Sequence, residues 1–267
     1  MRAFQCEYIT PAFDHSTFFT ERLNITMGWH HGPLVSFDVE STGVSPEDDR
    51  IVTATVWSYQ PGMSPVENSV LVDPGVEIPA AATSIHGITT EYARENGIPA
   101  GDAARLLAAE LADHIDQGVP VVVYNAPFDL TMLERECQRH GVPSLFDICA
   151  EDSLSPYFVD PLVLDRWLDS TRQGSRRLMT VCAAYGIELS EDEAHTSAGD
   201  ALAAARLAYK LAVRFPEVAG MSLSELQQVQ GREYRRQAEQ AAARFQGMGV
   251  ERDVSFEWPV RSPMLVV

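Results

Sequence analysis

Two acidic residues that share a strand face are the first candidates for chemistry in this sequence. Asp38 and Glu40 lie two residues apart in the alternating segment LVSFDVE, which spans 34–40. Side chains two apart on a strand point to the same face, so this pair places two negative charges side by side. Such charges repel unless a cation lies between them, and carboxylate oxygens suit Mg²⁺ or Mn²⁺. From the pair alone, a solvent-exposed polar strand end explains the pattern at least as well.

Asp129 falls at the start of a predicted helix. It follows the apolar run 119–125, which is typical of a strand buried on both faces, and Pro127 opens the helix. The helix dipole favours a carboxylate there by roughly 0.3–1 kcal/mol, which is a sufficient structural reason for it. The helix start nevertheless lies at the C-terminal end of a strand, as Asp38 and Glu40 do. Open α/β sheets bind their ligands at this edge.

The segment HTSAGD supplies one more acid and a histidine. Asp200 lies three residues after Ser197, the spacing of a capping box at the start of a helix predicted over 197–214. His195 precedes that helix, so on a loop it can lie over the helix start while Asp200 faces the sheet. A helix cap and an ordinary loop histidine are the alternative interpretations. With an unperturbed pKa of about 6.5, a histidine can take a proton from water near neutral pH.

An α/β fold has to bring these residues together. Alternation and β-branched content predict an antiparallel meander of three strands, at 34–40, 51–59 and 68–74. Two further strands are predicted at 119–125 and at the start of YFVDPLVLDRW. Helices are predicted at 82–95 (two short ones around Gly87), at 102–118 with Leu106, Leu107, Leu111 and Ile115 on one side, from Pro127 to about Gly141, near 176–185 and at 197–214. This order predicts a mixed sheet flanked by helices.

The sequence divides into a core and two extensions. The core is predicted over 33–215, after an irregular N-terminal arm at 1–32. A helical extension and tail follow at 216–267, with the helix broken near Gly231. The extension contains GREYRRQAEQAAARFQ, which is either a solvated helix face or a contact for a phosphate backbone. The two extensions cover a sheet edge, form a dimer contact or bind a partner, and the sequence does not choose between these roles.

Composition and charge exclude several classes of protein. The 267 residues are 45% hydrophobic and 22% charged, which is ordinary for a soluble globular chain. The sequence lacks the roughly 20 consecutive apolar residues of a membrane helix, and polar residues interrupt the N-terminal stretch, unlike a secretory signal. Four cysteines without a CxxC pair predict free thiols in the reducing cytoplasm. The net charge of −18 repels nucleic acid, so a protein of this charge that handles phosphates needs bound cations.

Three strings, in order, carry a resemblance to a known family. SFDVESTG, YNAPFD and HTSAGDA closely resemble the three exonuclease motifs of the DnaQ-like family, in its histidine-containing DEDDh branch. This family includes the proofreading subunits of bacterial DNA polymerase III, RNase T and oligoribonuclease. The resemblance covers about 33–213. A sister branch has a tyrosine where this sequence has Thr196, and the family often has a histidine where Tyr124 stands, a departure that removes no ligand.

The resemblance implies an RNase H-like fold and an activity. The expected protein is a metal-dependent 3′–5′ exonuclease that releases nucleoside 5′-monophosphates from the 3′ end of nucleic acid. Two divalent cations, Mg²⁺ or Mn²⁺, would be held by the four acids Asp38, Glu40, Asp129 and Asp200, with His195 as the general base. The implied substrate-binding residues are Ser41 and Thr42 at the terminal 3′-hydroxyl, Ile85 and His86 of SIHGIT at the terminal base, and Asn125 and Phe128. A loop brace and a core position are the alternatives for Asn125 and Phe128.

The resemblance leaves the substrate and partner open. DNA is favoured over RNA because the motif strings look more like the polymerase-associated group. This favours a 3′ end of single-stranded DNA as the substrate, a polymerase or other replication or repair protein as a partner, a role in proofreading or DNA repair, and a cytoplasmic location. The alternatives are an RNA-trimming exoribonuclease, an RNase H-type endonuclease, and a non-catalytic docking module for a polymerase or helicase. The complete set of five catalytic positions argues against a pure docking module.

Overall fold

A mixed six-stranded sheet forms the centre of the protein. The computed structural model describes residues 28–190 and 194–262. The strands are β1 (Leu34–Ser41), β2 (Ile51–Tyr59), β3 (Val66–Asp73), β4 (Ile98–Pro99), β5 (Val121–Val122) and β6 (Phe158–Val159), in the order β4-β3-β2-β1-β5-β6. The first three strands are antiparallel, and the three short strands are parallel to their neighbours. The predicted α/β fold with its three-strand meander is therefore confirmed.

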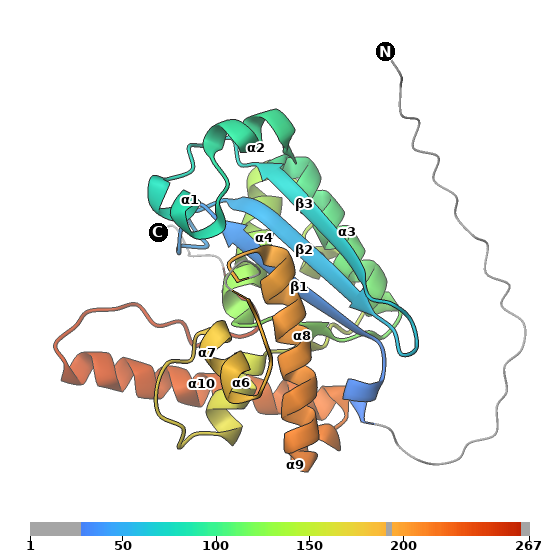
Figure 1. Ribbon diagram of the computed structural model, residues 1–267, viewed down its shortest axis with the longest axis vertical. Coiled ribbons are helices and arrows are strands. Elements are labelled where there is room, and N and C mark those ends of the chain that lie inside the picture. The colour runs from blue at the N-terminus through green and yellow to red at the C-terminus, as the bar shows by residue number, and fades with distance from the viewer. Residues whose placement is uncertain (1–27, 191–193, 263–267) are drawn as a thin grey trace, which may run out of the picture.

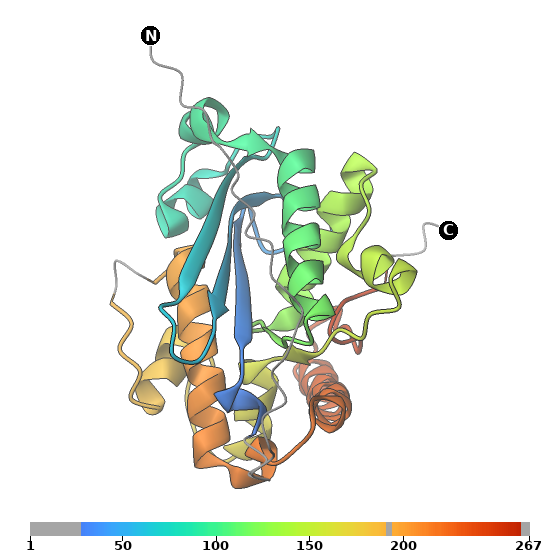
Figure 2. The same cartoon turned by 90° about the vertical axis from the view of Figure 1, so that its right-hand side faces the viewer.

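Helices cover both faces of the sheet (Figures 1 and 2). They are η1 (Trp29–His31), α1 (Ala80–His86), α2 (Thr90–Asn96), α3 (Ala100–Asp116), α4 (Ala126–His140), α5 (Leu145–Glu151), α6 (Pro161–Leu168), α7 (Leu178–Ala184), α8 (Ser197–Arg214), α9 (Pro216–Ala219) and α10 (Leu223–Gly247). One hydrophobic core lies between the sheet and α3 and α4, and a second lies between the sheet and α6, α7 and α8.

The alternation of β1 assigns its residues to the two faces. Val35, Phe37 and Val39 are buried in the core that contains α3 and α4. The intervening residues therefore face α8 on the opposite side, as Leu34 does from its place in the second core. This arrangement anchors β1 from behind and leaves the acidic residues at its C-terminal end facing the start of α8.

Two details differ from the sequence predictions. The strand β4 was not predicted, because two residues are too few to show a periodicity; Gly97 before it packs so tightly that a Cβ there would lie 2.5 Å from the Asp73 nitrogen. The placement of Leu106 with Leu107 and Leu111 was wrong. Leu106 is 50% exposed, whereas the other two are fully buried, because each helical residue is rotated by about 100° from the one before and Leu106 falls outside the arc that contains Leu107 and Leu111.

The helical extension covers the open edge of the sheet. The side chain of Gln230 accepts a hydrogen bond from the Asp160 nitrogen (2.7 Å) and donates one to the Phe158 oxygen (2.9 Å). Gln227 accepts a hydrogen bond from the Phe158 nitrogen at 2.8 Å. An edge strand has backbone N–H and C=O groups without a neighbouring strand to pair with. The amides of Gln227 and Gln230 bind these groups beside β6. Of the roles left open by the sequence, covering a sheet edge is therefore one that the described residues show.

The tail after α10 packs back on the domain. Trp258 donates a hydrogen bond from Nε1 to Asp160 Oδ2 (3.3 Å), and the Arg261 nitrogen donates one to Thr131 Oγ1 (3.0 Å). The break predicted near Gly231 was wrong, because α10 continues through it. A glycine costs a helix only about 1 kcal/mol, and the ring of Trp258 lies beside this position. Most of the predicted N-terminal arm (1–27) and the end of the tail (263–267) lie outside the described residues.

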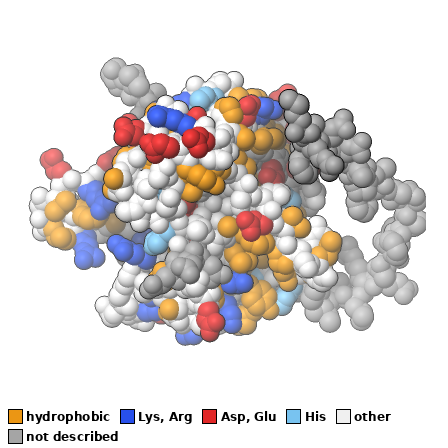
Figure 3. Space-filling view, turned by 45° about the horizontal axis from the view of Figure 1, so that its top comes forward, with side chains coloured by type: hydrophobic (Ala, Val, Ile, Leu, Met, Phe, Trp, Pro, Cys, Tyr) orange, Lys and Arg blue, Asp and Glu red, His pale blue; other side chains and the backbone are white. Residues whose placement is uncertain are grey.

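The surface carries charges of both signs. On the face in Figure 3, Lys and Arg side chains form small separate groups among acidic, apolar and uncharged surface. No broad positive surface is therefore present on that face to offset the net charge of −18. In the described part of the chain, no helix is both long enough and apolar enough to cross a bilayer.

The contacts of Gln230 predict a measurable stability effect. Replacing Gln230 with Ala leaves the buried Asp160 N–H and Phe158 C=O without partners, so the free energy of unfolding should fall by about 2–4 kcal/mol in urea titrations. Gln228→Ala on the exposed side of the same helix is the matched control and should change it by less than about 0.5 kcal/mol. Equal effects of the two substitutions would show that the extension does not stabilise the sheet edge.

Candidate active site

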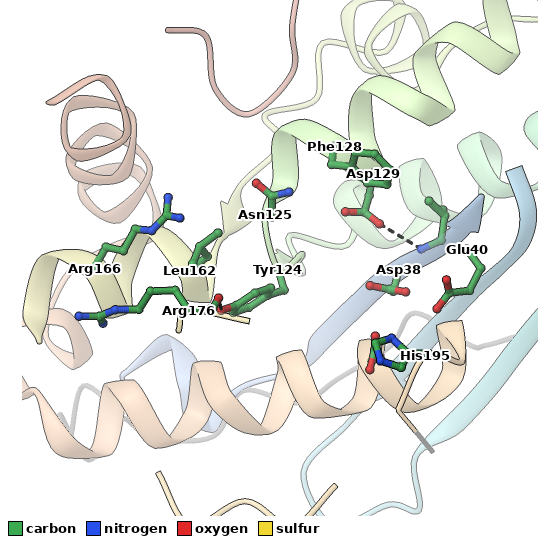
Figure 4. Close-up of a pocket in the computed structure, with 12 residues that line it drawn as sticks. Asp38, Glu40, Tyr124, Asn125, Phe128, Asp129, Leu162, Arg166, Arg176 and His195 are labelled. Atoms are coloured by element: carbon green, nitrogen blue, oxygen red, sulfur yellow. Dashed lines mark hydrogen bonds between the residues drawn. The ribbon is translucent and has the colours of Figure 1, made fainter. Parts of the chain in front are cut away.

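The five predicted catalytic residues line one cavity. It has a volume of about 370 Å³ and lies where the C-terminal end of β1 meets the first turns of α4 and α8 (Figure 4). Asp38 and Glu40 come from β1, Asp129 from α4, Asp200 from α8, and His195 from the segment that leads into α8. Residues separated by up to 162 positions in the chain thus meet at the sheet edge where ligand sites form.

Three of the carboxylates are close enough to share a cation. Ligand oxygens of Asp38, Glu40 and Asp200 all lie within 4.8 Å of one another. Asp38 and Glu40 point the same way from β1, and the first turn of α8 brings Asp200 opposite them. An all-carboxylate set of this kind suits hard divalent cations such as Mg²⁺ or Mn²⁺.

The side chain of Asp129 is held by the backbone of β1. It is 3% exposed and accepts a hydrogen bond from the Val39 nitrogen to Oδ1 at 3.0 Å. The parallel pairing of β1 with β5 is recorded only at Val35 and Ser36, so the backbone of Val39 lies beyond the end of this ladder. The short length of β5 therefore leaves an amide between Asp38 and Glu40 that holds Asp129 beside them.

The environment of these acids disfavours their negative charge. Burial raises the pKa of Asp38 well above its usual range, and the charges of Asp129, Asp200 and Glu40 raise it further. Burial, together with Asp200, raises the pKa of Glu40 to about 7. Burial also raises the pKa of Asp129 and of Asp200. Because burial and mutual repulsion destabilise the ionised carboxylates, a bound cation would stabilise the site.

His195 lies at the rim of the cavity beside Asp200. Its side chain is exposed, and its φ of 64° is a left-handed conformation that is uncommon outside glycine. Its backbone N–H bonds to the Asp200 carboxylate, and its ring lowers the pKa of Asp200 against the effect of burial. His195 is thus outside the helix and Asp200 faces the cavity, as the sequence predicted.

The predicted helix cap was displaced by one residue. Thr196, not Ser197, caps α8, since its Oγ1 accepts a hydrogen bond from the Gly199 nitrogen at 3.0 Å. The Ser197 hydroxyl is buried against β2 and lies 2.8 Å from Thr55 Oγ1 and 3.2 Å from Thr53 Oγ1. This side chain therefore joins α8 to the sheet, which sequence spacing alone cannot distinguish from capping.

Asp160 supports the turn before Asp129, and sequence analysis missed it. Its carboxylate accepts hydrogen bonds from the nitrogens of Asn125 and Ala126, each at 3.0 Å, and caps α6. Asn125 has a φ of 67°, so these bonds hold a left-handed turn at the start of α4. Because Trp258 also binds this carboxylate, the C-terminal tail is connected through Asp160 to the backbone that positions Asp129.

The predicted substrate-binding residues fall into two groups. Asn125 and Phe128 line the cavity. The other four lie outside its lining: Ser41, Thr42, Ile85 and His86. Thr42 is buried and donates a hydrogen bond to Asp49 Oδ1 within the turn after β1 (3.0 Å), while Ile85 is 56% exposed. The His86 ring lies against the backbone of Ser41, so α1 does approach the end of β1.

Two arginines line the end of the cavity opposite the carboxylates (Figure 4). Arg176 is held by the carboxylate of Asp165, which also binds Arg172, and donates a hydrogen bond to the backbone oxygen of Asp169 at 2.7 Å. Arg166 is exposed and has no ion pair within the part of the chain that the structure describes. Sequence analysis missed both, although four arginines between 166 and 177 are a signal in so acidic a chain.

Comparisons with known proteins agree with this geometry. The family model described as RNase T, exonuclease, matches residues 35–208. A DNA polymerase III subunit epsilon-like protein of Rhodobacter capsulatus is 28% identical over 67% of the chain, and a PolC-type DNA polymerase III of Lacticaseibacillus paracasei is 26% identical over 70%. The chain spans only 23% and 12% of the lengths of these two relatives.

Solved structures show the same fold. Exonuclease I of E. coli in complex with a dT13 oligonucleotide has a TM-score of 0.58 and 21% identity, over 70% of this chain and 42% of that one. Exonuclease I of Methylocaldum szegediense has a TM-score of 0.59 and 21% identity, over 77% of this chain and 45% of that one. The family match covers more than half of the residues and contains all three motifs. The chain therefore belongs to the RNase T exonuclease family, the DnaQ-like family of phosphodiester hydrolases that its motifs resemble.

Proposed function

We propose that the protein is a metal-dependent 3′–5′ exonuclease that removes nucleoside 5′-monophosphates from the 3′ end of a nucleic acid. The observation that carries this proposal is the cluster of Asp38, Glu40 and Asp200, whose oxygens lie within 4.8 Å of one another, with Asp129 bound beside them. Four carboxylates whose pKa values are raised by burial destabilise this end of the sheet when they are ionised. They do suit a site for divalent cations.

The residues present fit two divalent cations. Asp38, Glu40 and Asp200 would hold them, with Asp129 as the fourth acid, and the donors are the hard oxygens that Mg²⁺ or Mn²⁺ prefers. Bound cations would supply neutralisation of the scissile phosphate and a lower pKa for the attacking water. These cations would thereby overcome the repulsion that a chain of net charge −18 exerts on a phosphodiester.

His195 is the general base in this proposal. It lies at the exposed rim, where water and substrate can both reach it, and it is next to the carboxylate of Asp200. The left-handed backbone and the bond from its N–H to Asp200 fix its position relative to the carboxylates. His195 would therefore take the proton from the attacking water.

The opposite end of the cavity would contact the substrate. Arg166 supplies an uncompensated positive charge for a phosphate of the bound strand, and Asn125 lies between it and the carboxylates, with Phe128 beside Asp129 (Figure 4). Ser41, Thr42, Ile85 and His86 would approach the terminal nucleotide from the β1–β2 turn and α1. These four residues do not line the cavity, so their assignment to the substrate site rests on the family resemblance.

DNA is the favoured substrate. The relatives are DNA polymerase III proteins, and exonuclease I has been solved with DNA oligonucleotides and with SSB-Ct. These observations support single-stranded DNA as the substrate and a polymerase or another replication or repair protein as a partner, with proofreading or repair in the cytoplasm as the setting. The RNA-trimming alternative gives the same product pattern on RNA, and the docking alternative gives no product.

Replacing Asp200 with Asn should abolish hydrolysis while the fold persists. The substitution keeps the shape of the side chain but removes a charge that holds cations, so the rate should fall by roughly 10³-fold or more. The assay uses 5′-labelled single-stranded DNA, duplex DNA and RNA with Mg²⁺, Mn²⁺ or EDTA, and the wild type should give a ladder that shortens from the 3′ end. Asp113→Asn, on the exposed side of α3, should retain full activity. An active Asp200→Asn protein would contradict the proposal.

Replacing His195 with Ala should affect turnover rather than binding. Loss of a general base lowers kcat by roughly 10²–10⁴-fold, while KM should change less than threefold. Steady-state kinetics on single-stranded DNA separate these two effects. If kcat and KM change in equal proportion, or if Thr196→Ala gives the same loss of kcat, His195 has a structural role instead.

The raised pKa of Glu40 predicts a pH-dependent stability. A carboxyl whose pKa is about 7 in the folded protein and lower in the unfolded chain destabilises the fold at high pH, and this cost disappears as the pH falls toward its ordinary range. In EDTA, Glu40→Gln should therefore be more stable than the wild type by about 1–3 kcal/mol at pH 8 and nearly equal to it at pH 5.

The same titration has a metal-dependent control. Mn²⁺ should stabilise the wild type more at pH 8 than at pH 5.5, because cations bind the deprotonated acids, and Glu40→Gln should lose much of this gain. Glu239→Gln, an exposed substitution on α10, controls for the loss of one charge. A stability difference between Glu40→Gln and the wild type that stays constant from pH 5 to pH 8 would contradict the assignment of the cation site.

A further inference from the structure

A second cavity lies beside α8, apart from the carboxylates. Its volume is about 720 Å³, which is within the range of small-molecule sites. Its walls come from η1, the start of β1, the end of β2 with the loop that follows it, residues 186–188, and the outward side of α8. It shares no lining residue with the cavity of the five predicted catalytic residues. Figure 2 shows η1 next to the C-terminal half of α8, close to this position.

Two positive charges line this second cavity. Arg206 and Lys210 lie four residues apart on α8, so they are neighbours on one side of the helix. Both are exposed, and neither has an ion pair within residues 28–190 and 194–262. Lys210 is the single lysine of a chain whose net charge is −18. Glu188 also lines the cavity, so the lining carries two positive charges and one negative charge, a balance that favours an anion.

Aromatic rings form a second part of the lining. Trp57 is fixed by a hydrogen bond from its Nε1 to the Ala198 oxygen at 2.9 Å. The side chains of Tyr59 and Tyr209 are 43% and 41% exposed, so their rings are accessible to a ligand in the cavity. The ring of Tyr209 lies 5.7 Å from that of His30, which limits its freedom. Rings held in this way offer flat faces for stacking at little cost in entropy.

Buried polar groups in the lining lack partners. Ser36 is 1% exposed, and its hydroxyl makes no hydrogen bond with the described residues. His30 is 7% exposed, and its Nδ1 is likewise without a partner in the described residues. A buried polar group that forms no hydrogen bond is costly, so such groups in a cavity indicate that something else binds there. Ser36 is the stronger indication, because Gly28 packs against the Nδ1 edge of His30.

We infer that the second cavity binds a nucleotide, with the phosphate at Arg206 and Lys210 and the base against the rings of Trp57, Tyr59 and Tyr209. The combination of cations with flat aromatic rings is the chemistry that recognises a base joined to a phosphate. An acidic peptide shares only the charge.

The position of the cavity connects it to the proposed substrate, and the choice of ligand rests on the proposed function. Ser36 is two residues before Asp38 on the same face of β1, roughly 7 Å away along the strand. Arg206 follows Asp200 by six residues on α8, roughly 9 Å along the helix. A strand of a few nucleotides whose 3′ end lies at the carboxylates is long enough to span this separation, and a free nucleotide can also enter the second cavity.

Binding in EDTA tests the inference without hydrolysis, so a failure of the proposed enzymatic activity leaves this test intact. The double substitution Arg206→Gln/Lys210→Gln is compared with Arg94→Gln/Arg105→Gln, which removes two exposed charges elsewhere. Full-length proteins are titrated by calorimetry with thymidine 5′-monophosphate and by fluorescence anisotropy with labelled (dT)₄ and (dT)₁₂. A strand site should give about tenfold weaker (dT)₁₂ binding and a salt slope reduced by about 1.4 in the first variant alone.

A free-nucleotide site gives a different result in the same titrations. Thymidine 5′-monophosphate should then bind with the same affinity as (dT)₄, and Arg206→Gln/Lys210→Gln should lose at least tenfold for both. Tyr209→Ala should lower the affinity for the ligand that binds by about tenfold in either case. Tyr92→Ala, at an exposed tyrosine on α2, should leave this affinity unchanged. Equal affinities of the two double variants for every nucleotide probe would overturn the inference. Binding of the peptide Asp-Phe-Asp-Phe, but of no nucleotide, at Arg206 and Lys210 would overturn it as well.

Discussion

Repulsion among four carboxylates at one end of the sheet is the constraint on which the rest of the structure depends. Each acid is forced toward its neutral form by burial, and Asp38 also by the charges of Asp129, Asp200 and Glu40. Such a cluster persists only because separate elements hold its members: β1 is anchored by an apolar face, and α8 is joined to β2 through Ser197. A bound cation would restore the stability lost at this site, since neutralisation by an ion removes the repulsion.

The position of Asp129 follows from the interruption of a strand. The recorded pairing of β1 with β5 stops at Ser36, so the Val39 amide is left for a side chain rather than a neighbouring strand. The turn that brings Asp129 to this amide requires a left-handed Asn125, and Asp160 stabilises it with two backbone hydrogen bonds. Gln230 and Trp258 then bind the same residue, Asp160, from the C-terminal extension. The extension is thus connected to the site through backbone geometry, without lining the cavity itself.

What the sequence could predict depended on the range of the interaction. The alternation of 34–40 placed Asp38 and Glu40 on one face, because the direction of a side chain on a strand depends only on its local position. The three motifs identified Asp129 and Asp200 as the remaining acids of the site. Leu106 and Ser197 were misplaced because spacing admits two orientations, and tertiary contacts choose between them. Asp160, Arg166 and Arg176 were missed for a related reason. Their roles come from bonds and cavities formed across the chain, and no local pattern distinguishes them from surface charges.

The distribution of charge limits how the molecule can attract an anion. With a net charge of −18 and only small groups of Lys and Arg on the face in Figure 3, long-range attraction does not bring a nucleic acid to the protein. Positive charge must act at short range, and both cavities carry it: Arg166 lies at one end of the cavity lined by the carboxylates, and Arg206 with Lys210 lines the cavity beside α8. Under the proposed function, charges at these positions would act only on a strand that has already reached the cavities. An acidic surface would then favour binding of an end over loose binding along a duplex.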